Sequence, residues 1–199
     1  MAIELFKRVS PNDEKKFHSL LKIVDNALSK MHNLIKDLTE ERKNGHKYKT
    51  EEELLNFEHI LEDVRLTLSD NITAAKATIT SEINVSEITF SRRKLRTVIY
   101  NLINNSIKFR SEDRALKIEV TTRIEGDYIL ISVKDNGKGI DESKLDSIFS
   151  KYYRLENEIE GTGIGLYLVK EIINSTGGKV IVESKVDKGS DFKVYLKIE

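Results

Sequence analysis

Three segments rich in glycine or asparagine occur in a fixed order in the second half of the chain and constrain its fold more than any other feature. The last, Gly161–Leu166 (GTGIGL), opens an apolar helix and follows Asp135–Ile140 (DNGKGI) and Asn101–Phe109 (NLINNSIKF). Alternating glycines let a backbone approach a polyphosphate closely, and the free N–H groups at a helix start favour negative charge. Each segment alone is compatible with a turn, whereas the three together predict an ATP site.

The composition is that of a folded protein without net charge. The chain has 199 residues, of which 39% are hydrophobic and 33% charged, and Lys+Arg and Asp+Glu both total 33. We therefore expect no partner that is a nucleic acid and no direct membrane contact. The absence of cysteine excludes disulfides and thiolate metal sites. The longest apolar runs are too short to span a bilayer, and Met1–Lys7 lacks the pattern of a signal peptide, so we expect a cytoplasmic location, with membrane attachment left to any longer parent protein.

The first quarter of the chain has the apolar spacing of a helical bundle. Ser10–Glu14 indicates a helix start, and the apolar residues that follow alternate spacings of four and three: Phe17, Leu21, Val24, Leu28, Met31, Ile35 and Leu38. An ordinary amphipathic core helix is the alternative. The polar segment Glu41–Thr50 then resembles a linker, so we predict a helical unit over residues 1–46 and a second domain over residues 47–199.

The rest of the chain mixes helix and strand patterns. Helical periodicity covers Glu51–Ala75, Arg92–Phe109 and Ile164–Thr176. Strand patterns cover Ala77–Val85, Leu116–Ile124, Tyr128–Lys134, Lys179–Ser184 and Phe192–Ile198, with Glu125–Asp127 as a hairpin turn. We predict an α+β fold, a two-layer α/β sandwich with helices on one face of a mixed, mostly antiparallel sheet.

Asp135 directly follows a predicted strand, which places its carboxylate at a strand end where a loop can meet a ligand. A carboxylate there can accept a hydrogen bond from an exocyclic amine such as that of adenine. A tight turn is the alternative, because Asp, Asn and Gly are common turn residues.

Asn101, Asn105 and Lys108 fall at spacings of four and three, so they share one face of a predicted helix. Asparagine carbonyl oxygens suit Mg²⁺ that is also bound by phosphate and water, and a lysine suits phosphate. A merely solvated polar face is the alternative. We expect Asn104, one residue away from this line, to face solvent.

The segment between the second and third motifs has the composition of a lid. Aromatic residues precede Arg154, which could neutralise a terminal phosphate, and the mostly polar stretch Leu155–Glu160 leads into the glycines. The four histidines, His18, His32, His46 and His59, show no metal-ligand spacing, and none is followed by an acidic residue. We interpret them as structural or surface residues.

In this order, these segments resemble the catalytic ATP-binding domain of sensor histidine kinases, within the superfamily shared with type II topoisomerases, Hsp90-type chaperones and mismatch-repair ATPases. Asn101–Phe109 is similar to the N box, Asp135–Ile140 to the G1 box, Phe149–Arg154 to the F box and Gly161–Leu166 to the G2 box. The resemblance implies the Bergerat ATP-binding fold, ATP and Mg²⁺ as cofactors, and Asn105 as the metal ligand. It assigns catalytic roles to Asn101, Lys108 and Arg154, and cofactor contacts to Asn105, Phe109, Asp135, Gly137, Gly139, Ile140, Tyr153, Gly161, Thr162, Gly163, Ile164, Gly165, Leu166 and Ser190.

One departure from the family pattern concerns the phosphoacceptor. The family's acceptor histidine precedes an acidic residue on the first helix of a hairpin, and no such motif occurs here, whereas Pro11–Lys43 resembles the second helix. We therefore expect a catalytic fragment that phosphorylates a histidine absent from this chain, that dimerises through the hairpin and that has a response regulator receiver domain as partner. The alternatives are an ATPase of the wider superfamily, an anti-sigma-type serine kinase and a nucleotide-sensing module without catalysis. Asn101 stands where hydrolytic relatives have glutamate, which favours the kinase.

Overall fold

The computed structural model describes residues 52–155, 159 and 161–198, which belong to one compact unit. The predicted bundle helix and the predicted domain boundary lie outside these residues. Among them, no helix is both long and apolar enough to cross a bilayer.

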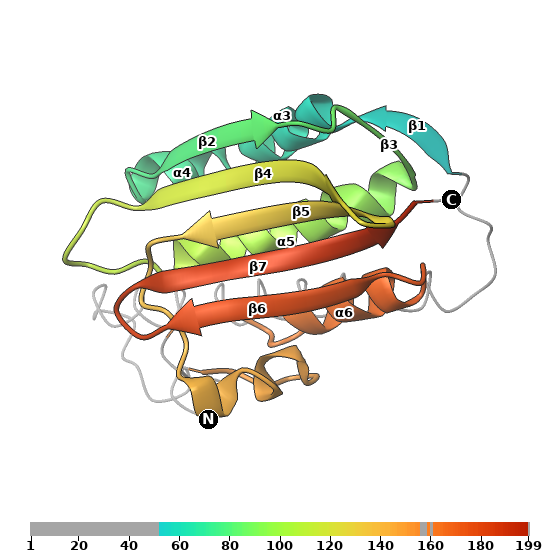
Figure 1. Cartoon of the computed structure of the whole chain (residues 1–199). Coiled ribbons are helices and arrows are strands. Elements are labelled where there is room, and N and C mark those ends of the chain that lie inside the picture. The colour runs from blue at the N-terminus through green and yellow to red at the C-terminus, as the bar shows by residue number, and fades with distance from the viewer. Residues whose placement is uncertain (1–51, 156–158, 160, 199) are drawn as a thin grey trace, which may run out of the picture. The chain divides into compact units, whose positions relative to one another are not determined.

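A five-stranded sheet forms the front layer of this unit in Figure 1. Its spatial order is β2 (Thr78–Ile83), β4 (Lys117–Glu125), β5 (Tyr128–Asp135), β7 (Gly189–Lys197) and β6 (Lys179–Lys185). β2 and β4 are parallel, and the other neighbours are antiparallel. Gly126 and Asp127 form the predicted turn between β4 and β5, with Gly126 at a φ of 61°. The predicted mixed, mostly antiparallel sheet is confirmed.

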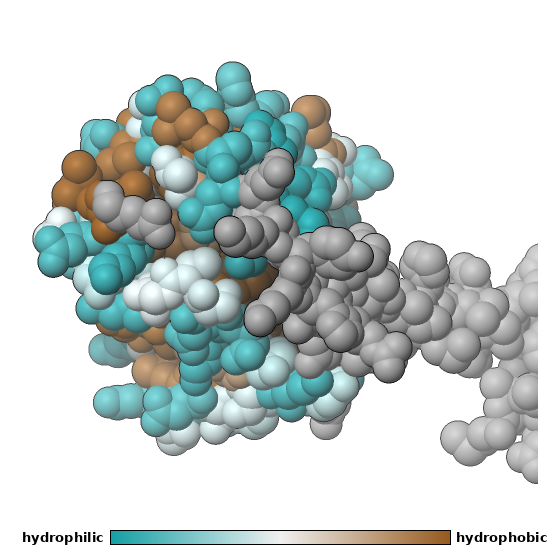
Figure 2. Space-filling view, turned by 90° about the vertical axis from the view of Figure 1, so that its right-hand side faces the viewer, coloured by the Kyte–Doolittle hydropathy of each residue, from teal (hydrophilic) through white to brown (hydrophobic). Residues whose placement is uncertain are grey.

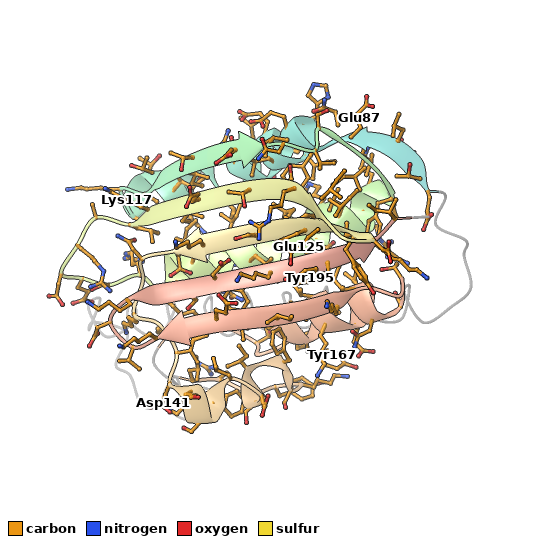
Figure 3. All side chains as sticks on the ribbon, viewed as in Figure 1. Glu87, Lys117, Glu125, Asp141, Tyr167 and Tyr195 are labelled. Carbon is orange, nitrogen blue, oxygen red and sulfur yellow. The ribbon has the colours of Figure 1, made fainter. Side chains whose placement is uncertain are left out.

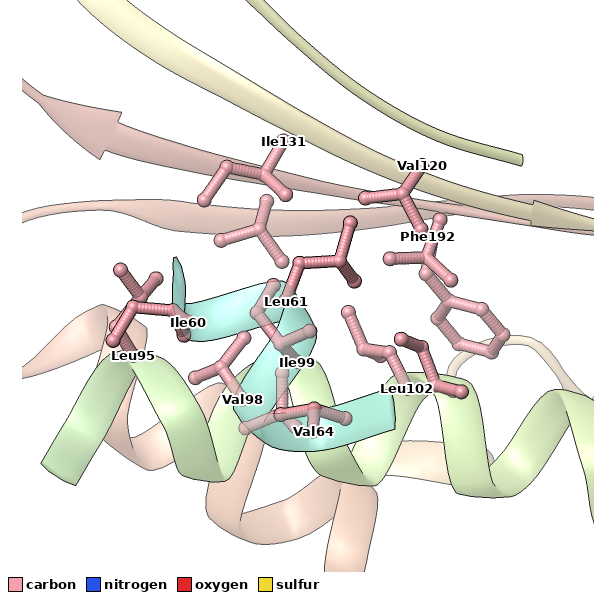
Figure 4. Close-up of a cluster of buried hydrophobic side chains, with 14 of the residues drawn as sticks. Ile60, Leu61, Val64, Leu95, Val98, Ile99, Leu102, Val120, Ile131 and Phe192 are labelled. Atoms are coloured by element: carbon pink, nitrogen blue, oxygen red, sulfur yellow. The ribbon is translucent and has the colours of Figure 1, made fainter. Parts of the chain in front are cut away.

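Helices cover one face of the sheet and close the core. α3 (Phe57–Thr67), α4 (Ser69–Ala74), α5 (Arg92–Lys108) and α6 (Gly165–Asn174) lie behind the strands in Figure 1. The apolar stripe of α5 packs between α3 and the strands, as Figure 4 shows for Leu61, Ile99 and Val120, each of which is fully buried. Two short 3₁₀-helices, η1 (Glu142–Lys144) and η2 (Ser147–Phe149), connect β5 to the segment before α6.

Two short strands were not predicted. β1 (Glu53–Asn56) pairs antiparallel with β3 (Glu87–Phe90) in a separate two-stranded sheet, where a continuous helix from Glu51 was expected. Leu54 is 64% exposed while Leu55 is fully buried, which is the alternation of a strand. Asn56 then caps α3, because its side-chain oxygen accepts a hydrogen bond from the His59 N–H at 3.1 Å.

Within the described residues, no helix packs on the other face of the sheet, which carries exposed and half-buried side chains. Glu125 and Tyr195, labelled in Figure 3, extend from β4 and β7 on this open face, and the Tyr195 hydroxyl donates to Glu125 at 3.3 Å. Lys179 lies over the Tyr195 ring at 4.6 Å. Figure 2, which views the molecule from the end where β1 lies, shows apolar and polar residues interspersed on the surface.

The Thr122 side chain on β4 is hydrogen-bonded to the segment that follows β2. Its side chain is fully buried on the helix-covered face, and its hydroxyl accepts from the Val85 N–H at 3.0 Å and donates to the Val85 carbonyl at 2.9 Å. Both main-chain groups of the half-buried Val85 are therefore hydrogen-bonded by one hydroxyl.

We expect Thr122→Val to lower the free energy of unfolding by about 1–3 kcal/mol, because valine has the same shape but removes two hydrogen bonds to the half-buried main chain of Val85. Thr121→Val is the matched control, since Thr121 is the preceding residue of β4 and lies on the open face. Urea unfolding of both variants measures the effect. Equal stability of the two would contradict the assignment.

Candidate functional site

Asp135 is the last residue of β5, and its carboxylate is held by donors from three separate segments. Oδ1 accepts from the Gly137 N–H at 2.8 Å and from the Ser190 N–H at 3.3 Å. Oδ2 accepts from the Ser106 hydroxyl at 3.0 Å. The side chain is thereby fixed at the edge of the sheet, between the loop that follows β5 and the start of β7.

Burial raises the pKa of the Asp135 carboxyl above its ordinary value. The hydrogen bonds from Gly137, Ser106 and Ser190 oppose this shift, and the negative charge of Asp191 adds to it. Desolvation thus outweighs the three hydrogen bonds, so the ionised form of Asp135 is less favourable in the folded protein than in water.

Two glycines let the loop after β5 approach the β6–β7 turn. A Cβ on Gly139, whose φ is 71°, would lie 2.0 Å from the Lys185 carbonyl oxygen. A Cβ on Gly189, whose φ is 108°, would lie 2.0 Å from the carbonyl oxygen of Asp135 itself. Only glycine fits these positions. The Ile140 N–H donates to the Ser184 hydroxyl at 2.8 Å, and Ser184 is hydrogen-bonded to Ser190 at 2.9 Å, which joins the same two segments again.

The predicted polar face of α5 meets the third motif. The amide nitrogen of Asn101 donates to the Thr97 carbonyl at 2.8 Å, and its Oδ1 would lie 2.6 Å from a Cβ on Gly165. The Lys108 ammonium would lie 3.8 Å from a Cβ on Gly161. Asn105 is half-buried, and within the described part of the chain no hydrogen bond of its side chain is found.

Asn104 differs from the expectation that it faces solvent. It is half-buried, and its Oδ1 is buried without a hydrogen-bond partner among the residues that the structure describes. The helical spacing predicts which side of α5 the residue occupies, but burial there depends on neighbours that the spacing does not reveal.

The third motif leads into α6 without a side-chain cap. Gly165 is the first residue of α6, and Ile164 before it is fully buried. Ile164, the N-cap residue, therefore supplies no side-chain acceptor to the first N–H groups of this helix. Gly163, at a φ of 73°, packs against the backbone of Tyr152 and Tyr153, and its carbonyl accepts from the Tyr152 N–H at 2.9 Å.

Several of the predicted site residues lie in the segment before α6 or at the start of this helix. Tyr153 and Leu166 are half-buried against the core, and the Arg154 guanidinium donates to the Ile159 carbonyl at 2.6 Å. Thr162 is also half-buried. Residues 156–158 and 160 of the predicted lid lie outside the described residues.

α5 brings the three sequence motifs together. Phe109, the residue that follows α5, contacts the second motif, because its carbonyl accepts from the Lys138 N–H at 2.9 Å and a Cβ on Gly137 would lie 2.6 Å from the same oxygen. The Asn101 and Lys108 side chains of α5 lie near Gly165 and Gly161 of the third motif. Among the described residues, no cluster of three or more histidine or acidic side chains could hold a metal ion.

Three residues of this site were not singled out from the sequence. Ser106, only 2% exposed, lies within the apolar stripe of α5, and a polar residue in such a stripe indicates a buried partner. The Asn136 side chain accepts from the Lys117 N–H at 2.8 Å and donates to the Ala115 carbonyl at 3.0 Å. Arg114 donates to three main-chain carbonyls, and no sequence signal predicts that role.

The comparison with protein families gives one match over more than half of the chain. Residues 90–199 match the profile described as "Histidine kinase-, DNA gyrase B-, and HSP90-like ATPase". Among curated proteins, the chain is 28% identical over 182 residues to the methanogenesis regulatory histidine kinase FilI of Methanothrix harundinacea. That alignment covers 92% of this chain and 20% of FilI, so the chain spans about a fifth of that relative's length.

Solved structures of histidine kinases share the fold. Full-length ShkA in complex with AMPPNP aligns with a TM-score of 0.73 and 20% identity over 96% of this chain and 40% of that one. ThkA in complex with the response regulator protein TrrA aligns with a TM-score of 0.71 and 21% identity over 99% of this chain and 55% of that one. Together with the family match, they confirm the predicted resemblance to the catalytic domain of sensor histidine kinases.

We expect Asp135→Asn to raise the free energy of unfolding of the unliganded protein at neutral pH. A raised pKa means that the folded state binds a proton more readily than the unfolded state, so the stabilising contribution of the protonated form is lost as the pH rises through the folded pKa. The neutral amide removes this penalty. Urea unfolding at several pH values should show the largest difference near neutrality and a smaller one at acidic pH, and a variant less stable at every pH would contradict the dominance of desolvation.

Proposed function

Because this chain belongs to the family of histidine kinase-, DNA gyrase B- and HSP90-like ATPases, we propose that it is the ATP-binding catalytic portion of a two-component sensor histidine kinase. It transfers the γ-phosphoryl group of ATP to a histidine. The observation that carries the proposal is that α5 places Asn101 beside Gly165 and Lys108 near Gly161 of the third motif while Ser106 donates to Asp135. This proximity supports the proposal that the three motifs contribute to one site.

The adenine end of the proposed site is the Asp135 carboxylate. Among the described residues, Oδ1 accepts from two N–H groups and Oδ2 from one donor, the Ser106 hydroxyl, which leaves Oδ2 with further capacity to accept. An amine that donates to this oxygen gains a charge-assisted hydrogen bond at a buried carboxylate. The exocyclic amine of adenine is such a donor.

The phosphate end is formed by the amino terminus of α6 and by α5. The first turn of α6, which its N-cap residue Ile164 does not cap with a side chain, favours negative charge. Gly163 and Gly165 let this segment pack closely against the Tyr152–Tyr153 backbone and the Asn101 side chain. Lys108, next to Gly161, supplies positive charge at the same end. In this proposal Arg154 completes the neutralisation of the γ-phosphoryl group.

Mg²⁺ fits the donor chemistry around Asn105. The amide oxygen of this half-buried residue is a neutral, hard ligand, and Mg²⁺ takes few protein ligands when phosphate oxygens and water complete its coordination. When bound, the ion would neutralise charge on the phosphates. Asn105 would hold it on the side of α5 that faces the third motif.

Asn101 favours phosphoryl transfer to protein over hydrolysis. An amide cannot take a proton from an attacking water, and the amide nitrogen of Asn101 is already engaged by the Thr97 carbonyl. The packing of its Oδ1 against Gly165 gives it a positioning role toward the start of α6. An ATPase of the wider superfamily would need a general base at this position to activate the attacking water.

The proposed partners follow from the relatives. FilI is named a histidine kinase, and the ThkA structure contains a response regulator protein. We propose a response regulator receiver domain as the partner of this protein and a homodimer as its assembly. None of the four histidines precedes an acidic residue, so the acceptor we propose is a histidine outside this chain.

Asn105→Ala should weaken the binding of AMPPNP at least about tenfold in Mg²⁺ and leave it nearly unchanged in chelator, because the lost group is a metal ligand. Calorimetric titration in both conditions measures this. Asn104→Ala, the neighbouring residue of the same type on α5, is the matched control and should lose little in either condition. An equal loss with and without Mg²⁺ would assign Asn105 a structural role.

Phosphotransfer tests the whole proposal. The protein, incubated with γ-labelled ATP and Mg²⁺, should place acid-labile label on a supplied two-helix hairpin that carries a phosphoacceptor histidine, and should not label itself. Asp135→Asn should abolish the transfer because it presents a donor to the adenine amine and removes an acceptor.

Other outcomes of this experiment would point elsewhere. Rapid release of phosphate without label on the hairpin would favour an ATPase. Binding of nucleotide without either reaction would favour a nucleotide-sensing module, and acid-labile label on this chain alone would identify an acceptor among its own histidines.

A further inference from the structure

Arg114 lies in the connection between α5 and β4, outside the three motifs, and its guanidinium reaches two loops of the site. Nε donates to the Asn136 carbonyl at 2.6 Å, and Nη2 donates to the Gly137 carbonyl at 2.7 Å and to the Asp187 carbonyl at 2.9 Å. The first two acceptors belong to the loop that follows Asp135, and the third belongs to the β6–β7 turn. One side chain therefore connects both segments that supply N–H donors to Asp135.

The bond to the Asn136 carbonyl acts directly on the donor that holds Asp135. A peptide unit is planar, with its C=O and N–H pointing in opposite directions. The carbonyl of Asn136 accepts from Arg114, and the N–H of the same peptide, on Gly137, donates to Asp135 Oδ1 at 2.8 Å. Arg114 thus fixes the orientation of this peptide, and a positive donor on its oxygen strengthens the hydrogen bond made by its N–H.

The bond to the Asp187 carbonyl acts on the second donor. Asp187 lies in the β6–β7 turn at a φ of 61°, and its own N–H donates to the Lys138 carbonyl at 2.7 Å. Ser190, three residues later, gives its N–H to Asp135 Oδ1. Arg114 and the Asp187 N–H therefore hold the turn against the loop from two sides, which sets the distance between the two donors of Oδ1.

An arginine suits this role better than a lysine. The three acceptors are neutral carbonyls from two segments, and a planar fork reaches them from different nitrogens. A lysine ammonium is a single point that cannot match both directions. Charged donors to main-chain carbonyls are also stronger than neutral ones.

We propose that Arg114 is a positioning residue for base selectivity, which orients the Asn136–Gly137 peptide and the β6–β7 turn so that Asp135 presents Oδ2 to an amino group of the base. This inference rests on the proposed ATP site. Arg114 does not touch the nucleotide in it, and acts only through the backbone groups around Asp135.

The test compares AMPPNP with GMPPNP, because a guanine base places a carbonyl where adenine has its amine. Arg114→Ala should reduce the affinity for AMPPNP about tenfold and change that for GMPPNP less than about twofold, so the preference between the two falls about tenfold. Arg114→Lys should lower the preference for AMPPNP over GMPPNP by a smaller factor than Arg114→Ala does. Millimolar guanidinium chloride should restore part of the preference in Arg114→Ala.

Arg110→Ala is the matched control, since Arg110 lies in the same connection and, among the described residues, donates to the Ile107 carbonyl of α5 at 3.1 Å rather than to a loop of the site. It should keep the preference of the wild type. An unchanged preference in both Arg114 variants, an equal loss for both nucleotides, or the same loss in Arg110→Ala would overturn the role of Arg114. A wild-type protein that does not prefer AMPPNP would instead overturn the proposed adenine site itself. If Arg114→Ala does not fold, as judged by its thermal unfolding curve, the Arg114→Lys result decides.

Discussion

The burial of one carboxylate is the constraint on which the site depends. An ionised carboxyl group removed from water is tolerable only where hydrogen-bond donors replace its hydration. For Asp135 these donors come from α5, from the loop after β5 and from the start of β7. The placement of β5 beside β7 and of α5 behind them is therefore a requirement of the site as well as of the core.

Most of the fold could be predicted because its long elements have clear periods. α5 carries its apolar residues at helical spacing, and β4 and β5 are joined by a turn containing Gly126. The short strands were missed for a physical reason. Leu54 and Leu55 fit the helical pattern that continues into α3, and only the pairing of β1 with β3, thirty or so residues along the chain, selects the extended form. Four-residue strands contain too few residues for a period to be decisive.

The motifs of the candidate site could be predicted from the sequence, but the residues that hold its loops by hydrogen bonds could not. Glycines and asparagines indicate chemistry through their own conformational and ligand properties, so Asp135, Asn105 and Gly165 stand out in the sequence. Arg114 and Asn136 act by donating to or accepting from main-chain groups, and any residue type supplies such partners. Their roles exist only after the loop and the turn are brought together, which local patterns do not describe.

The unfavourable burial of Asp135 bears on how the proposed site selects its base. A buried carboxylate oxygen that can still accept a hydrogen bond selects between ligands in two ways. It attracts a ligand that places an N–H opposite it, and it disfavours a ligand that places an oxygen there, because that oxygen cannot donate a hydrogen bond to the carboxylate. A guanine carbonyl would meet Oδ2 in this way, whereas an adenine amine donates to it. The same desolvation that makes the unliganded carboxyl group unfavourable makes the hydrogen bond to an amine stronger than it would be in water. Stability of the free protein and selectivity for the base are therefore opposed at this one residue, and the rigid hydrogen-bonded loops around it keep the unfavourable geometry in place.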